Sequence, residues 1–165
     1  EEHRSWANRL QRISRSSRKS IVSEAQPNAA PHIAVIDDDT ELLKLMVLLL
    51  RRIGAQTTTI ADGQEALHYL ADGTPDLIIL DLMLPHVNGF DILRRIRNDP
   101  RFDPVPVLVL SAKVEPQTIR EVLEAGADGY VTKPYAANSL VDRVRLLLAS
   151  GRQTAPPDRP PTGST

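Results

Sequence analysis

The fold of this chain is decided by the stretch Leu77-Ile78-Ile79-Leu80-Asp81, in which four apolar residues lead directly into an acid. Two other stretches have the same form: Ile33-Ala34-Val35-Ile36 leads into Asp37-Asp38, and Val107-Leu108-Val109-Leu110 leads into Ser111. Short, continuous apolar runs are typical of buried parallel strands. Because parallel strands end at one edge of a sheet, we expect these polar residues to converge where open α/β folds hold their ligands.

Helical patterns alternate with strand patterns along the middle of the chain. Strands are predicted at Ile33–Ile36, Gln56–Ile60, Leu77–Leu80, Val105–Leu110 and Gly129–Thr132. Helices are predicted at Thr40–Arg52, Gly63–Leu70, Gly89–Arg97, Pro116–Glu124 and Ala136–Ala149. This alternation favours a parallel sheet covered on both faces. The sequence therefore predicts an α/β fold, a three-layer doubly wound sheet of five parallel strands.

The charge pattern divides the 165 residues into three parts. Residues 1–30 carry six basic and three acidic residues, whereas residues 31–150 carry 12 basic and 17 acidic ones. We interpret 1–30 as a basic arm or linker, in which Trp6, Leu10 and Ile13 are spaced for one face of a short helix. Residues 31–150 are predicted to form one domain, and 151–165 a Pro-rich flexible tail or linker.

Composition excludes several classes of function. Without cysteine the chain has neither a disulfide scaffold nor a thiolate metal site. The apolar run Leu45–Leu50 is too short to cross a bilayer, and the charged N-terminal segment lacks a signal-peptide core. The net charge of −1 gives no electrostatic reason for tight nucleic-acid binding. We therefore expect a cytoplasmic protein that binds neither membranes nor, through this segment, nucleic acid.

The acids at the predicted sheet edge are suited to a metal ion. Asp37, Asp38 and Asp81 would crowd negative charge, which is costly unless a cation neutralises it. Oxygen-only ligands favour Mg²⁺ or Mn²⁺ over zinc. A carboxylate beside such a metal can also attack phosphorus, and Lys133 and Ser111 follow or end neighbouring strands. The pattern predicts a divalent-cation and phosphoryl site.

The set of motifs resembles the receiver domain of two-component response regulators. The motifs are Asp37-Asp38, Asp81-Leu82-Met83-Leu84-Pro85 with Gly89 beyond it, Ser111-Ala112, and Lys133-Pro134. Each motif alone is weak, but in this order and on alternating elements the set is specific. The resemblance covers roughly His32 to Ser150 and implies a flavodoxin-like strand order 2-1-3-4-5.

The resemblance assigns roles to the acidic residues. It makes Asp81 the phospho-accepting carboxylate. Asp38, Asp81 and the backbone carbonyl of Met83 would bind Mg²⁺ directly, and Asp37 would hold metal-bound water. As a plainer alternative, Asp37 and Asp38 would act only as acids near a helix N-terminus, a role for which Asp39 is available as the cap.

The resemblance also assigns a phosphate-binding pair and a switch. Lys133 would pair with the phosphoryl group, and its bond to Pro134 would be cis. Ser111, in place of the commoner threonine, would donate a hydrogen bond to the phosphoryl group. Tyr130 matches the aromatic switch position, which changes rotamer as Ser111 moves, although ordinary surface packing of Tyr130 is an equal alternative.

The function implied is a phosphorylation-controlled switch rather than an enzyme. A histidine kinase or histidine phosphotransfer protein would donate phosphate to Asp81 with Mg²⁺, and catalysis would be limited to the chain's own phosphorylation and dephosphorylation. Partner binding would change through the fourth and fifth strands and the helices after them, and a phosphorylation-dependent homodimer is one form this could take. The downstream effector stays open.

Three other classes of protein are alternatives to this one. An aspartyl-nucleophile phosphatase usually has an acid two residues after the nucleophile, where this chain has Met83. A flavin module would need small residues in place of Asp37-Asp38-Asp39, whose charges repel a cofactor phosphate. A purely structural interaction domain would be unaffected by Asp81→Asn.

Overall fold

The five predicted strands form one parallel sheet. The computed structural model describes residues 29–152. Its strands are β1 (His32–Ile36), β2 (Gln56–Ile60), β3 (Leu77–Leu80), β4 (Val107–Ser111) and β5 (Gly129–Thr132). Their order in the sheet is β2-β1-β3-β4-β5 and every pairing is parallel. The predicted fold class and strand order are confirmed.

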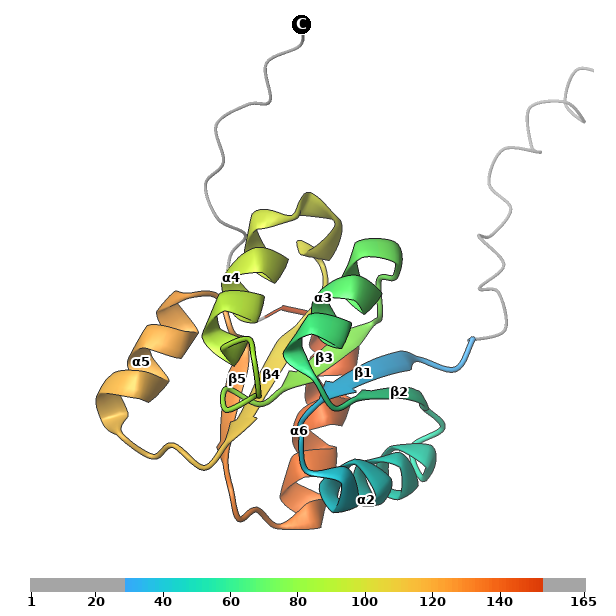
Figure 1. Ribbon diagram of the computed structural model, residues 1–165. Helices are drawn as coiled ribbons and strands as arrows, with labels where there is room; N and C mark the ends of the chain where they lie inside the picture. The colour runs from blue at the N-terminus through green and yellow to red at the C-terminus, as the bar shows by residue number, and fades with distance from the viewer. Residues whose placement is uncertain (1–28, 153–165) are drawn as a thin grey trace, which may run out of the picture.

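Helices cover both faces of this sheet, as Figure 1 shows. They are α2 (Thr40–Arg51), α3 (Gly63–Asp72), α4 (Gly89–Asn98), α5 (Pro116–Glu124) and α6 (Ala137–Ser150), with a 3₁₀ turn η2 (Pro100–Phe102) after α4. Buried side chains of α3, α4 and α5 share one hydrophobic cluster with the sheet, and those of α2 and α6 share the other. The described part of the chain is thus a three-layer α/β sandwich.

The apolar strands form the centre because both of their faces are covered. Ile33 and Val35 of β1 pack towards α2 and α6, whereas Ala34 and Ile36 pack towards α3, α4 and α5. All four residues of β3 are buried as well. Continuous apolar runs are what a doubly covered parallel sheet needs, which explains why they predicted the fold.

Several element boundaries differ from the sequence prediction, and the largest differences, of two residues, are at the beginning of β4 and the end of α3. Strand β4 begins at Val107 rather than Val105, because Pro106 has no N–H and the N–H of Val105 donates to the carbonyl of Phe102 at 3.0 Å. Strand β4 also includes Ser111, which pairs in register with Thr132. Helix α3 continues to Asp72, beyond the predicted end at Leu70.

A buried ion pair ties the far end of α4 to the beginning of β5. The Arg97 guanidinium donates to Asp128 Oδ2 at 2.8 Å and to the carbonyls of Phe102, Val105 and Gly126 at 2.8–3.0 Å. Burial lowers the pKa of Arg97 to about 10, so the side chain stays cationic at neutral pH. A buried charge is tolerated only when it is paired and hydrogen-bonded in this way.

The chain beyond α6 begins by contacting this buried pair. Arg152 Nη1 donates to the Asp103 carbonyl at 3.2 Å, and Arg152 Nε lies 3.5 Å from Asp128 Oδ1. The Arg152 side chain is only 6% exposed. Of the predicted tail the structure describes only Gly151 and Arg152, and the basic arm with Trp6, Leu10 and Ile13 lies outside the described residues.

Within residues 29–152, none of the helices has the length and apolar character that a bilayer crossing requires. This agrees with the sequence, in which the longest apolar run of the first helix is short.

Candidate functional site

Three acids meet at the carboxyl edge of the sheet. Asp37 and Asp38 follow β1, and Asp81 follows β3, the neighbouring strand. Carboxylate oxygens of the three residues all lie within 4.8 Å of one another. Asp37 and Asp81 are buried, whereas Asp38 is exposed. Strand order alone brings residues 37 and 81 together across 44 positions of sequence.

One cation reaches two of these acids. Lys133, directly after β5, places Nζ 2.5 Å from Asp37 Oδ2 and 2.9 Å from Asp81 Oδ2. The Lys133 N–H also donates to the Ser111 carbonyl at 2.9 Å, which fixes the lysine beside β4. The Lys133–Pro134 peptide is cis, as the family resemblance implies. Lys133 thus spans from the fifth strand to the acids of the first and third.

Burial and pairing act in opposite directions on the charges of the site. Burial raises the pKa of Asp37, and the hydrogen bonds from Lys133 and the Asp39 backbone offset this only in part. Burial alone would lower the pKa of Lys133, but its hydrogen bonds to Asp37 and Asp81 outweigh that effect and raise it. The lysine is therefore held as a cation, while the pocket as a whole remains rich in negative charge.

Backbone geometry fixes Asp81 and brings the next helix close. The N–H of Met83 donates to Asp81 Oδ1 at 3.0 Å, and the Asp81 N–H donates to the Ile36 carbonyl at 2.9 Å. A Cβ on Gly89 would collide with the Asp81 carbonyl oxygen and would lie 2.6 Å from Leu82 Cα. Only glycine fits this approach, so α4 begins directly against the residue that carries the carboxylate.

The hydroxyl side of the site lies on β4 and β5. Ser111 is fully buried at the end of β4, and its Oγ lies 3.4 Å from the Lys113 N–H. The Tyr130 hydroxyl donates to the Lys113 carbonyl at 2.8 Å. Burial raises the pKa of Tyr130, and a hydrogen bond with Ser111 offsets part of that rise. The Tyr130 hydroxyl therefore lies against the β4–α5 loop and Ser111.

The residues of the pocket fit a divalent cation. Among residues 29–152, three carboxylates and one ammonium meet here, so the cluster has an excess of two negative charges when all four groups are ionised. The donors are oxygens only, which suits a hard ion such as Mg²⁺. Asp39, by contrast, accepts hydrogen bonds from the N–H groups of Glu41 and Leu42 and is the N-cap of α2, as predicted.

Comparison with known proteins identifies the family. Residues 33–145 match the response regulator receiver domain. The chain belongs to this family. The match spans the sheet and the first part of α6, and it includes all of the strands that carry the acids, the serine and the lysine.

Individual relatives agree with this membership. The DNA-binding response regulator MtrA of Mycolicibacterium smegmatis is 43% identical over 116 residues, which are 70% of this chain and 50% of that protein. The chain thus spans about half the length of the curated relatives it matches. A Francisella response regulator receiver domain is 32% identical with a TM-score of 0.67, covering 72% of this chain and 97% of that one.

A second similar structure is a receiver domain activated by BeF3. It belongs to DrrB, a Thermotoga maritima protein, and is 30% identical with a TM-score of 0.67, covering 73% of this chain and 99% of that one. As a member of this family, the chain contains a receiver domain of the kind found in response regulators of two-component systems.

Sequence reasoning named the residues that meet at this site but did not predict two backbone contacts beside them. It gathered Asp37, Asp38, Asp81 and Lys133, which the fold brings together, and it placed Ser111 and Tyr130 on the adjoining strands. It did not single out the close approach at Gly89 or the Lys113 carbonyl that receives the tyrosine hydroxyl. Both depend on backbone positions in loops, for which residue type gives little signal.

Proposed function

We propose that this receiver domain is a phospho-accepting switch whose acceptor is Asp81. The observation that carries the proposal is the placement of Asp81: a buried carboxylate with one oxygen held by the Met83 N–H and the other by Lys133. These two hydrogen bonds fix the orientation of the carboxylate that would attack the phosphoryl group. Phosphoryl transfer depends mainly on positioning and charge stabilisation, both of which this pocket supplies.

Asp38, Asp81 and the backbone carbonyl of Met83 would hold Mg²⁺ (or Mn²⁺), and Asp37 would hold water bound to it. The ion supplies charge neutralisation when a phosphoryl group approaches the acids. Residues of this chain would contact the phosphoryl oxygens. Lys133 is already positioned at Asp81 Oδ2, where phosphoryl oxygens would lie, and Ser111 ends the strand beside it.

Phosphorylation would then change the surface of β4, α5, β5 and α6. The added charge attracts Lys133 and the Ser111 hydroxyl. Tyr130 is coupled to Ser111 by a hydrogen bond and to the β4–α5 loop through the Lys113 carbonyl. The phosphoryl donor in this proposal is a histidine kinase or a histidine phosphotransfer protein. The chain would catalyse only its own phosphorylation and dephosphorylation, and its output would be a change in partner binding, with phosphorylation-dependent homodimer formation as one form.

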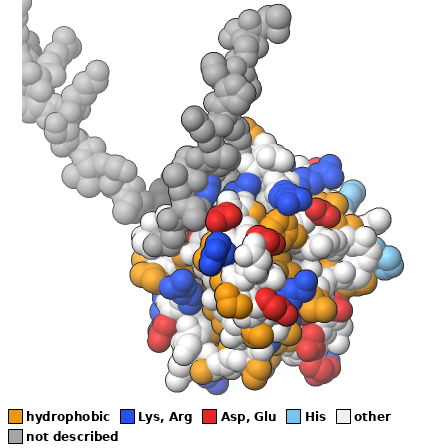
Figure 2. Space-filling model, turned by 90° about the vertical axis from the view of Figure 1, so that its left-hand side faces the viewer, with side chains coloured by type: hydrophobic (Ala, Val, Ile, Leu, Met, Phe, Trp, Pro, Cys, Tyr) orange, Lys and Arg blue, Asp and Glu red, His pale blue; other side chains and the backbone are white. Residues whose placement is uncertain are grey.

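We expect the receiver domain itself not to bind nucleic acid. MtrA is described as DNA-binding, but that name belongs to a protein of which this chain covers half. On the face that carries α5, Figure 2 shows basic and acidic side chains interspersed rather than a patch of one sign. Nucleic-acid surfaces normally gather Lys and Arg on one face.

The proposal is tested with beryllofluoride, the group that activates the similar receiver domain of DrrB. Adding it with Mg²⁺ to isotope-labelled chain should shift the amide signals of Ser111, Tyr130 and Lys133, and removal of Mg²⁺ should reverse the shifts. Asp81→Asn should abolish them, whereas Asp62→Asn, which changes a helix cap elsewhere, should preserve them. Shifts of equal size in the Asp81→Asn variant would contradict the assignment.

A further inference from the structure

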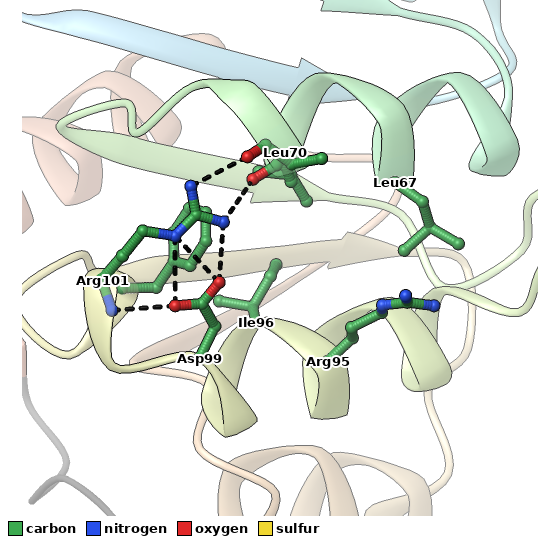
Figure 3. Close-up of a pocket in the computed structure, with 8 residues that line it drawn as sticks. Leu67, Leu70, Arg95, Ile96, Asp99 and Arg101 are labelled. Atoms are coloured by element: carbon green, nitrogen blue, oxygen red, sulfur yellow. Dashed lines mark hydrogen bonds and ion pairs between the residues drawn. The ribbon is translucent and has the colours of Figure 1, made fainter.

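A groove between α3 and α4 lies apart from the acidic site. It encloses about 240 Å³ and is lined by Leu67, Leu70, Ala71, Arg95, Ile96, Asp99, Arg101 and Phe102. Figure 3 shows Arg101 at one end of the groove and Arg95 and Leu67 towards the other. Clefts that hold whole small-molecule ligands usually measure roughly 300–1,000 Å³. The groove is therefore better matched to a few side chains of a peptide than to a cofactor.

One end of the groove is closed by a rigid arginine. Arg101 donates to the carbonyls of Leu70 and Ala71 at 3.0 and 2.9 Å and is paired with Asp99 at 2.7 Å, as the dashed lines in Figure 3 show. These bonds satisfy the last carbonyls of α3, which has no basic residue of its own in its final turn. Arg101 is therefore part of the wall and is not available to a ligand.

The other arginine of the groove has no such role. Arg95 is exposed, and among residues 29–152 it forms no ion pair or hydrogen bond. Its neighbour Arg94, in contrast, lies over the Phe90 ring and pairs with Asp91 at 3.9 Å. An arginine at the rim of an apolar floor suits an occupant that carries both apolar groups and a carboxylate.

The last described residue contacts the chain just beyond η2, which contributes to one end of this groove. This residue, Arg152, is bonded to the carbonyl of Asp103, the residue directly after η2 and next to the groove residue Phe102. The segment that follows reads Gln153-Thr154-Ala155-Pro156-Pro157-Asp158-Arg159-Pro160-Pro161, with Asp158 as its single acid. Its apolar prolines and one carboxylate match the floor of the groove and Arg95.

The length of this segment is sufficient. Six residues from Arg152 to Asp158 reach about 19 Å at the roughly 3.1 Å per residue of a polyproline helix. Asp99 and Arg95 are one turn of α4 apart, about 6 Å along its axis, and η2 adds a similar distance at roughly 2 Å per residue. Proline-rich segments also lose little conformational freedom on binding, because they are extended beforehand.

We propose that residues 153–161 occupy the groove between α3 and α4, with the prolines on the apolar floor and Asp158 paired with Arg95. The buried Arg152 is the positioning residue that directs the segment along η2. Whatever follows the receiver domain would then leave the molecule over α3 and α4 rather than from the end of α6. This inference does not depend on phosphorylation.

The test uses the full chain, which has no cysteine, with a nitroxide attached to Thr162→Cys. The spin label should broaden the amide signals of Leu67, Leu70 and Arg95 at every dilution. Arg95→Glu and Asp158→Lys should each lower the ratio of docked to undocked segment by roughly twofold to fivefold, the effect of one partly exposed ion pair. The double variant should restore it.

Arg94→Glu is the matched control, because it makes the same charge change one residue away and outside the groove lining. It should leave the broadening unchanged. Equal broadening in Arg95→Glu and Arg94→Glu, no restoration in the double variant, or no broadening of these signals would overturn the proposal. Broadening that disappears on dilution would also overturn it, because the occupant would then be a second copy of the chain.

Discussion

Asp38→Asn should stabilise the folded protein in the absence of metal, although most substitutions destabilise. The three carboxylates lie within 4.8 Å of one another. At that separation each like-charge pair costs roughly 0.9 kcal/mol at the dielectric constant of water and more inside protein. Lys133 offsets part of the cost for Asp37 and Asp81. Removing the charge of Asp38 should therefore raise the free energy of unfolding by about 1 kcal/mol.

Urea unfolding in EDTA at low ionic strength measures this difference. Asp39→Asn is the matched control, since asparagine also caps a helix and the N-cap of α2 would be kept. The gain of Asp38→Asn should shrink as salt is added. In saturating Mg²⁺ the order should reverse, because the unchanged chain gains about 2.7 kcal/mol at one hundred times its dissociation constant. A loss of stability in EDTA, or a gain equal to that of Asp39→Asn, would refute the crowded-charge argument.

Three further predictions concern packing, the buried ion pair and pH. Gly89→Ala should lower the free energy of unfolding by about 3 kcal/mol or more, because its Cβ would meet backbone atoms, whereas Gly73→Ala should cost far less in the same urea titration. Arg97→Met should cost about 3–5 kcal/mol by leaving Asp128 buried without this partner, against less than about 0.5 kcal/mol for the exposed Arg94→Met. Burial raises the pKa of Asp37, so ionisation of Asp37 lowers the free energy of unfolding. This loss of stability is absent below the ordinary carboxyl pKa and is complete above the raised pKa of the folded state. Asp37→Asn should accordingly stabilise metal-free protein at neutral pH and have little effect in acid, and a gain that is the same at both would contradict this.

Much of the fold could be predicted because its strands are buried on both faces. The runs around β1 and β3 are continuous and apolar, a pattern typical of strands in a covered parallel sheet. The same pattern places the beginning of β4 two residues too early, because Val105 is as apolar as the strand but its N–H closes the turn at Phe102. The spacing of apolar residues indicates which side chains are buried, but it does not indicate which acceptor each backbone N–H bonds to.

The site could be predicted for a related reason. Once parallel strands are assigned, the residues that follow them must share one edge. The strand order that makes Asp37 and Asp81 neighbours and brings Lys133 to them is implied by the family resemblance. The Arg97–Asp128 pair could not be found in this way. Its partners are 31 positions apart, and the only local signal is a charge at a position where α4 buries its other side chains. The contacts of Arg152 with Asp128 and Asp103 could not be predicted either, because these partners lie far from it along the chain. Composition alone places Arg152 in a flexible tail.

The most direct test of the phospho-acceptor site is the intact mass of the chain after incubation with acetyl phosphate and Mg²⁺. We expect the gain of a single phosphoryl group that is stable in acid, is lost in base, requires Mg²⁺ and is absent from Asp81→Asn. An adduct that persists in Asp81→Asn, or that forms equally well in EDTA, would contradict the claim that the acids at the ends of β1 and β3 form a metal-assisted phospho-acceptor site.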